Sequence, residues 1–254
     1  MHLLKLKVMT IDPLKRSKVL ESVADAWEGQ PMLNFSEFVG TLKNLGLSYA
    51  TDDDEIIEMC ARLTEVYPSL LPQVDGRVEG MWLATVEDAA GVAARVVLTH
   101  SHVFIHRWGY DVSPGVWKYS ALRPTGPNRP LVITDTQGFE HRLGVVFGMA
   151  RLIPRFTQAL PRSFSRDSLS GHKVIVELVG GKRVLLASMV HVYTPGNRAV
   201  GHEKYRWESV HELAVGKPLR VALVSAGVLE LNPVQEIFLA DAPTAQVKSD
   251  FGNF

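Results

Sequence analysis

Residues 172–193 read HKVIVELVGGKRVLLASMVHVY, two runs rich in apolar and β-branched residues on either side of a glycine pair. Both central residues of a tight type I′ hairpin turn need a positive φ angle, which glycine adopts without steric cost. The stretch therefore predicts a β-hairpin with strands over residues 172–179 and 182–193 and its turn at Gly180-Gly181.

Similar β-rich runs lie on both sides of this hairpin. Turn-forming clusters at residues 111–115 and 124–130 separate the upstream runs from one another. Apolar and β-branched content predicts upstream strands over residues 78–86, 94–108, 116–122, 130–134 and 139–152. Downstream, the pattern predicts a short helix over residues 203–213 and strands over residues 219–231 and 235–241.

The N-terminal third has a different character. Residues 3–11 alternate apolar and polar side chains, which predicts a half-buried strand. Leu20, Val23, Ala24 and Trp27 then follow the spacing of one face of a helix.

Two more helices are expected before the β-rich region begins. Asn34 and Glu37 have the spacing of a capping box, and Gly46 is placed to end that helix. A third helix is expected after Thr51. Its acidic first turn, residues 52–55, suits the positive end of the helix dipole.

The order of strand, helices and then mostly strands predicts an α+β fold. In it, the N-terminal strand and amphipathic helices pack against a mostly antiparallel β-sheet. We expect a single domain over residues 1–241, with a subdivision near 70–77 into a helical part (1–72) and a β-rich part (77–241) as the alternative. Residues 242–254 are polar and are expected to form a flexible tail.

Composition restricts the class of protein. The chain has 254 residues, with 27 basic and 27 acidic side chains, so net charge favours no particular partner. A single cysteine, Cys60, excludes an internal disulfide and favours a reducing compartment. We expect an intracellular protein, because neither a signal peptide nor a membrane-spanning apolar run is found.

Charge is unevenly distributed along the chain. Residues 21–88 contain 14 acidic and 3 basic side chains, whereas residues 95–230 contain 18 basic and 9 acidic ones. Such regions can attract each other head to tail between copies or within one copy. Alternatively, they are two surfaces that differ only in how they are solvated.

The strongest indication of an enzyme is a set of histidines after a predicted strand. His100, His102 and His106 follow VLT and resemble the metal-binding turn of the metallo-β-lactamase fold. That family has an aspartate and a histidine where this chain has Phe104 and Ile105. We therefore expect ordinary strand histidines and no metal, and keep a degenerate metallohydrolase as an alternative.

Other catalytic motifs are not found. The sequence contains neither a Gly-x-Ser-x-Gly nucleophile elbow nor a glycine-rich phosphate loop. Cys60 lies on the apolar face of a predicted helix, as a core residue does. We expect a protein that is not an enzyme, with no catalytic residues and no cofactor.

Residues 151–183 are the best candidate for a binding surface. They combine many basic side chains with Phe156 and Phe164, a composition that suits the phosphates of lipid headgroups or nucleoprotein. The alternative is a solvated loop with extended basic side chains. The candidate membrane- or phosphate-binding residues are Arg151, Arg155, Arg162, Arg166, Lys173, Lys182 and Arg183.

Three segments, in order, resemble the matrix proteins of rhabdoviruses and related negative-strand RNA viruses. The first is LKLKV at residues 4–8, followed by Trp27-Glu28 and by residues 38–46 ending in Leu-Gly. The second runs from Leu160-Pro161 to a Gly-led strand at residues 171–178. The third contains Trp207-Glu208, the run ALVSAGVLE at residues 222–230 and a closing strand at residues 237–241.

This resemblance implies a structural protein that self-associates, contacts an anionic membrane surface peripherally and condenses the viral nucleocapsid during virion assembly and budding. Its locations would be the virion, the host cytoplasm and the inner face of membranes. Pro243-Thr244-Ala245 is similar to part of a budding signal, so host budding machinery is a possible partner. The remaining alternative is an RNA-binding coat or movement protein.

Overall fold

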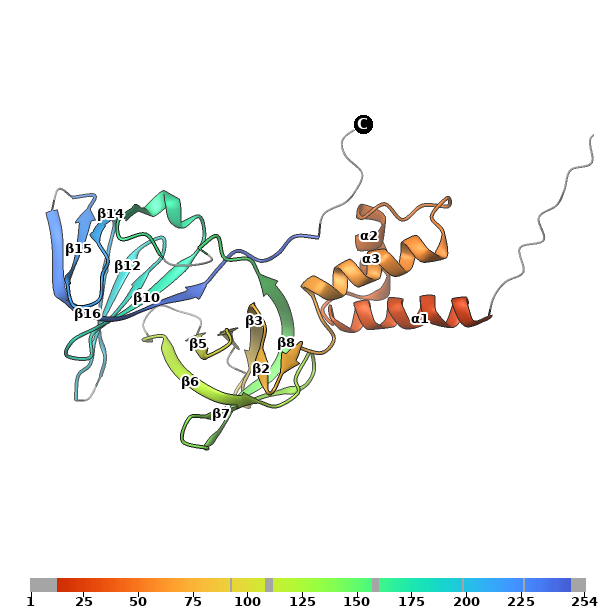
Figure 1. Cartoon of the computed structure of the whole chain (residues 1–254), viewed down its shortest axis with the longest axis horizontal. Coiled ribbons are helices and arrows are strands. Elements are labelled where there is room, and N and C mark those ends of the chain that lie inside the picture. Colours follow the sequence, from red (N-terminus) through yellow and green to blue (C-terminus); the bar gives the residue numbers. More distant parts are fainter. Residues whose placement is uncertain are drawn as a thin grey trace, which may run out of the picture.

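The computed structural model describes residues 13–91, 93–107, 112–156, 160–197, 199–225 and 227–247. They form three units in a row (Figure 1): three helices at one end, a β-barrel in the middle and a second β-sheet at the other end. The strand predicted over residues 3–11 lies outside the described residues.

The helical unit contains α1 (Pro13–Glu28), α2 (Phe35–Asn44) and α3 (Asp53–Val66). The predicted capping box at α2 is confirmed: the Asn34 side chain accepts from the backbone N–H of Glu37, and the Glu37 carboxylate accepts from that of Asn34. Asp52 and Glu55 make the same exchange at α3. Gly46, with φ of 111°, follows the end of α2 as predicted.

The three helices bury their own core, which includes Ala26, Phe38, Leu42, Cys60 and Leu63. α1 faces this core with Val23, Ala26 and Trp27, whereas Leu20 is 62% exposed. The face of α1 that packs on the core therefore differs from the predicted face by a rotation of about one residue around the helix axis.

The middle unit is a closed six-stranded antiparallel barrel in which neighbouring strands are consecutive along the chain and β8 pairs back to β3. Its interior is filled by Trp82, Leu98, Tyr119, Leu131, Ile133 and their neighbours. A short hairpin, β1 (Gln73–Val74) and β2 (Arg77–Val78), precedes it. The barrel strands are β3 (Met81–Glu87), β4 (Ala93–Leu98), β5 (His102–Arg107), β6 (Gly115–Leu122), β7 (Pro130–Asp135) and β8 (Glu140–Leu152).

The third unit is an eight-stranded sheet in the order β13-β12-β11-β10-β16-β15-β14-β9, with all neighbours antiparallel. A short 3-10 helix, η1 (Arg166–Leu169), follows its first strand. The strands are β9 (Phe164–Ser165), β10 (Lys173–Leu178), β11 (Arg183–Leu186), β12 (Val190–Thr194), β13 (Gly201–Tyr205), β14 (Trp207–Glu212), β15 (Pro218–Leu223) and β16 (Gly227–Asp241).

The predicted hairpin at Gly180-Gly181 is confirmed, with Glu177 of β10 opposite Arg183 of β11. The second strand predicted over residues 182–193 is wrong, because this run forms two antiparallel strands, β11 and β12. The turn is one residue longer than the predicted two, because the Leu178 N–H donates to the Lys182 carbonyl across Val179, Gly180 and Gly181. Both glycines have positive φ, 91° and 81°, a backbone region that glycine adopts without steric cost.

β16 joins the two halves of this sheet. Its first part, residues 227–233, pairs with β15, and its second part, residues 234–241, pairs with β10. Pro233 is the last residue of β16 that pairs with β15, and pairing with β10 begins at the next residue. Proline lacks the N–H that a continuous ladder would use. The sheet bends there and encloses a core around Trp207, which is fully buried and donates its indole N–H to the Ala187 carbonyl.

The prediction of an α+β fold with helices covering the sheet is wrong. The protein is mostly β, with 45% of residues in strands and 20% in helices. The barrel closes on itself and the second sheet bends around its own core, so neither needs helices to cover an apolar face. The helices instead bury a separate core of their own.

The helix predicted over residues 203–213 is also wrong, because this stretch forms β13 and β14. Trp207, Val210 and Leu213 face the core at a spacing of three, which resembles helical periodicity. Register shifts on both sides of Ser209-Val210 produce this spacing within a strand.

The barrel and the eight-stranded sheet share an apolar junction that includes Leu83, Phe104, Ile175, Tyr193 and Phe238. Helices and barrel meet through the linker after α3, where the Leu71 N–H donates to the Thr125 carbonyl. Residues 242–247 return along the barrel and carry Val247 to the helical core.

Candidate functional site

The three candidate metal-binding histidines do not converge. His100 is exposed in the turn between β4 and β5, whereas His102 and His106 lie on β5. Four residues along a strand separate the latter two by roughly 13 Å, too far for one metal ion. The part of the chain that the structure describes contains no cluster of three or more His, Cys, Asp or Glu side chains arranged to hold a metal.

Another histidine pair lies on the eight-stranded sheet. His191 Nδ1 is 3.0 Å from His202 Nε2, and the two rings stack at 5.2 Å. Burial, with smaller contributions from His202, His106 and Lys204, lowers the pKa of His191 to about 4. His191 is therefore neutral at pH 7, and it packs within the sheet in hydrogen-bonding distance of His202.

The seven candidate phosphate-binding residues are spread over the molecule. Four arginines are exposed: Arg151 near the end of β8, Arg155 and Arg162 in the segment that joins the barrel to the sheet, and Arg166 at the start of η1. Lys182 lies at the β10–β11 turn, the far end of β10 from Lys173. Lys173 donates to Asp241 at 2.6 Å.

Arg183 is also held within the fold. Its guanidinium donates to Glu177 and to the Pro114 carbonyl, so it is committed to joining β10, β11 and the barrel.

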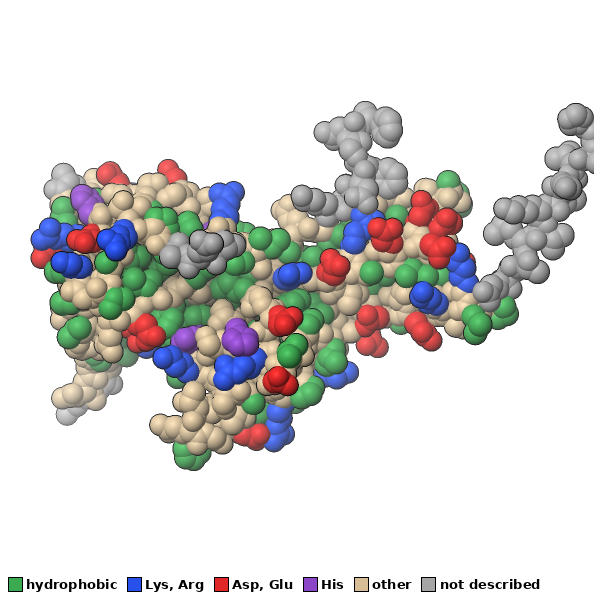
Figure 2. Space-filling view, viewed as in Figure 1, with side chains coloured by type: hydrophobic (Ala, Val, Ile, Leu, Met, Phe, Trp, Pro, Cys, Tyr) green, Lys and Arg blue, Asp and Glu red, His purple; other side chains and the backbone are tan. Residues whose placement is uncertain are grey.

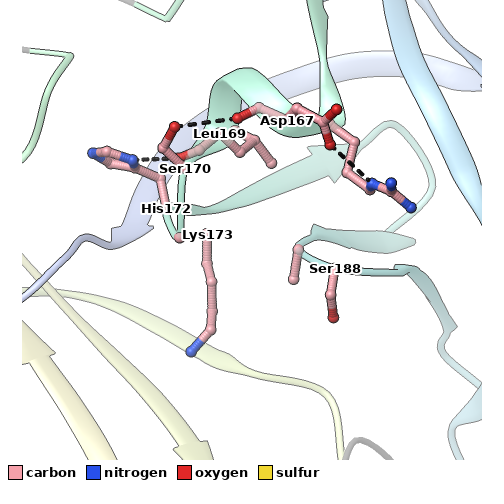
Figure 3. Close-up of a pocket in the computed structure, with 9 residues that line it drawn as sticks. Asp167, Leu169, Ser170, His172, Lys173 and Ser188 are labelled. Atoms are coloured by element: carbon pink, nitrogen blue, oxygen red, sulfur yellow. Dashed lines mark hydrogen bonds and ion pairs between the residues drawn. The ribbon is translucent and has the colours of Figure 1, made fainter.

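A hollow of about 410 Å³ lies beside η1, close to the segment that carries these arginines (Figure 3). Figure 3 shows the His172 ring and the Lys173 side chain running in different directions. Arg166 is 3.5 Å from Asp167, and His172 accepts from the Arg155 N–H at 2.9 Å. The charged ends diverge, so this hollow offers no convergent cage for a phosphate.

The segment similar to a budding signal is built into the fold. Thr244 forms an antiparallel bridge with Leu152, and the Ala245 N–H donates to the Arg151 carbonyl at 2.8 Å. Ala245 is 4% exposed. A host protein could bind these residues only after the segment had detached from the barrel.

A polar cleft of about 430 Å³ lies between the barrel and the eight-stranded sheet. On the face shown in Figure 2, histidine, acidic and basic side chains gather between these two units. We call this site the junction cleft. Its lining includes His102, Trp117, Lys118, Asp135, Thr136, Gln137, His141, Glu177, Glu236 and Phe238.

The barrel supplies an aromatic wall of the junction cleft. Trp117 on β6 is 43% exposed and stacks on His141 of β8 at 5.9 Å and 17°. His141 Nε2 is 2.8 Å from Asp135 Oδ2. This hydrogen bond, with others from the backbone N–H groups of Phe139 and Gln137, lowers the pKa of Asp135.

The sheet supplies a carboxylate wall. Glu177 of β10 lies directly opposite Glu236 of β16 in the ladder. Like charges in such a pair repel unless cations balance them. Arg183 pairs with Glu177, and Lys118 of the barrel lies 3.8 Å from Glu236.

His102 lies between the two walls and packs on Phe238 at 5.1 Å. Burial lowers the pKa of His102, against the opposing effect of Glu236. The cleft therefore presents carboxylates, two imidazoles and one indole, all positioned by strands or by the turn between β7 and β8. It is suited to hydrogen bonding and stacking.

Sequence reasoning did not find the junction cleft. Of its lining, only His102 and the Arg183 that supports Glu177 were candidates, each for another role. The other residues come from strands far apart in the sequence, so no local motif marks them.

No protein-family model, curated protein or solved structure matches the chain. Among the described residues, the helices are too short or too polar to cross a membrane.

Proposed function

We propose that the protein is a structural protein that acts by binding further copies of itself, without a catalytic step. The observation that carries this proposal is the opposite charge of its two ends. Residues 13–66 contain ten acidic and five basic side chains, and all ten acidic ones are exposed. Residues 153–241 contain eleven basic and eight acidic side chains. Figure 2 shows the acidic side chains on the helical unit.

The arrangement of the units favours contact between copies over contact within one copy. The helices and the eight-stranded sheet lie on opposite sides of the barrel (Figure 1). The apolar junction and the contacts of Asp241 with Lys173 and Arg95 hold the barrel to the sheet. Because the two charged ends cannot approach each other in one molecule, their attraction is satisfied by a neighbour.

The helical unit also exposes apolar anchors beside its acidic residues. Lys15 of α1 donates to Asp54 of α3 at 2.7 Å, which brings the first turns of these helices together. Leu14 is 80% exposed there, and Tyr49 in the preceding loop is fully exposed. We call Leu14, Tyr49 and residues 52–55 the distal tip. Charge would orient the encounter, and the apolar groups would supply affinity.

A contact between two different surfaces of one chain is heterologous and generates rings or open filaments. The more specific form of the proposal is a viral matrix-like protein that lines an anionic membrane and condenses a nucleocapsid. The mostly β fold differs from the α+β fold expected for it. The matrix-like form is supported by the three sequence segments that resemble matrix proteins. Its mechanism is multivalent, because weak contacts between copies and with lipid become strong when they act together.

Sedimentation velocity as a function of concentration and salt tests self-association. We expect association at low salt that weakens at high salt, because a charged interface is screened. Asp53→Lys, at a residue with no capping role, should weaken association, and Tyr49→Ser should do the same. Glu79→Lys, an equal charge reversal on the barrel, is the matched control. A monomer under all conditions, or equal effects of Asp53→Lys and Glu79→Lys, would contradict the proposal.

Co-sedimentation with anionic and neutral vesicles tests the matrix-like form. Binding only to anionic vesicles, reduced at high salt, would support it. Vesicles left unbound together with RNA binding that falls steeply with salt would favour the coat or movement protein instead. Stoichiometric zinc in the purified protein would favour the metallohydrolase.

A further inference from the structure

We propose that the junction cleft binds a neutral saccharide. This function is separate from self-association, because the residues that line the cleft belong to the barrel and the sheet, whereas the distal tip belongs to the helical unit. Three properties of the cleft favour such a ligand: largely paired charges, an exposed indole and many hydrogen-bonding groups.

Charge in the junction cleft is largely compensated. Glu177 is paired with Arg183 and Glu236 with Lys118, and the Asp135 carboxylate is hydrogen-bonded to the His141 ring. A cationic ligand would have to displace these partners. An anionic ligand would meet three carboxylates at close range. The ligand class that fits without breaking a pair is polar and uncharged.

The indole of Trp117 provides an apolar surface at the mouth of this polar cleft. It is 43% exposed and is held by the parallel stack with His141, so its orientation is fixed before a ligand binds. The C–H face of a pyranose ring packs on such a surface, and this contact removes the exposed indole from water, which favours binding. Preorganisation reduces the entropy lost on binding.

Hydroxyl groups of a saccharide would find many partners around the indole. The paired carboxylates keep acceptor oxygens free, since each ionised carboxylate can accept about four hydrogen bonds. Glu177 and Glu236 lie side by side across neighbouring strands and can accept from vicinal hydroxyls. Thr136 and Gln137 add a hydroxyl and an amide from the β7–β8 turn. A cleft of about 430 Å³ has the volume of a typical small-molecule site.

Saturation-transfer NMR and calorimetry on the full chain test the inference. The probes are neutral mono- and oligosaccharides of glucose, galactose, mannose and N-acetylglucosamine, at millimolar concentrations. We expect saturable binding of at least one, and about tenfold weaker binding for Trp117→Ala, the loss expected from one aromatic contact. Glu236→Gln, which keeps an acceptor but changes the charge, should weaken binding less than Trp117→Ala.

Tyr49→Ala, which removes an exposed aromatic ring on the helical unit, is the matched control and should leave saccharide binding unchanged. Trp117→Phe separates a binding defect from a folding defect, because it keeps a ring at the barrel mouth and should retain part of the affinity. Three results would overturn the proposal: no saccharide binds, Trp117→Ala and Tyr49→Ala have equal effects, or spermidine or inorganic phosphate binds with the same dependence on Trp117. If no saccharide binds, the proposal of self-association still stands, so the two proposals fail independently.

Discussion

The carboxylate of Asp241 lies 2.6 Å from the ammonium group of Lys173, and the same oxygen accepts from Arg95 at 3.1 Å. Asp241 ends β16, Lys173 begins β10, and Arg95 belongs to the barrel. One buried carboxylate therefore ties two strands of the sheet to the barrel. This contact explains why Lys173, a candidate phosphate-binding residue in the sequence, is committed to the fold.

Replacing Asp241 by Asn should destabilise the protein. The Asp241 side chain is only 7% exposed, so the change leaves two partly buried cations without a counter-charge. Removing one partner of a buried pair costs roughly 3–5 kcal/mol, and the partial exposure of Lys173 and Arg95 lowers our expectation to about 2 kcal/mol. Urea unfolding measures this loss.

The control is Glu230→Gln, which breaks the Arg220–Glu230 pair on the surface. Both of these side chains are more than half exposed, so we expect less than about 0.5 kcal/mol. If both variants lost the same stability, the buried contact would have no special role.

The stability of the protein should fall in mild acid because of His191. Burial lowers the pKa of His191 from 6.5 to about 4. Between these values the folded protein binds fewer protons at this site than the unfolded chain does. The free energy of unfolding therefore falls as pH falls through this window, by about 3 kcal/mol in full, and is unaffected by His191 above it. Thermal unfolding between pH 8 and pH 4 measures the slope.

His191→Gln should flatten this pH dependence, because glutamine keeps a hydrogen-bonding group and does not titrate. Burial also lowers the pKa of His102 and of His106, so a shallower slope of the same sign should remain. His100→Gln, at an exposed position in a turn, should leave the wild-type profile unchanged. A profile that His191→Gln does not alter would refute the assignment.

The capping residues give a prediction for the helical unit. Asn34→Ala removes the acceptor for the Glu37 N–H, and we expect a loss of about 1 kcal/mol. Asp53→Ala, inside the first turn of α3 and without a capping bond, should cost less. Helical circular dichroism on heating would detect both changes, and equal losses would contradict the capping role.

These capping residues also show what the sequence can predict. Asn34 with Glu37 and Gly180 with Gly181 act within a few residues, so their chemistry determines local structure directly. The three helices, the turn at Gly180-Gly181 and the strands β3, β6, β7 and β8 follow from such signals. The single strand predicted over residues 94–108 is wrong, because this run forms the hairpin of β4 and β5.

Long-range pairing could not be predicted in the same way. Nothing in MWLATVE, residues 81–87, indicates that this strand pairs with β8 to close a barrel. Without that closure, a β-rich region beside helices suggests a sheet that the helices cover. The junction cleft was missed for the same reason, because Trp117, His141 and Glu236 meet only after the barrel and the sheet have formed.

Two glycines should respond to alanine with opposite signs. A Cβ atom at Gly126 would overlap the Ser69 carbonyl oxygen in the linker between helices and barrel. A Cβ at Gly40 in α2 would meet nothing within 4 Å. We expect Gly126→Ala to cost about 2 kcal/mol through strain and Gly40→Ala to gain about 1 kcal/mol through helix propensity. Urea unfolding of both variants tests the pair. A loss confined to the helical unit in Gly126→Ala would show that the linker contact stabilises the helices, whereas an unchanged free energy of unfolding would show that the helices and barrel do not meet at Ser69.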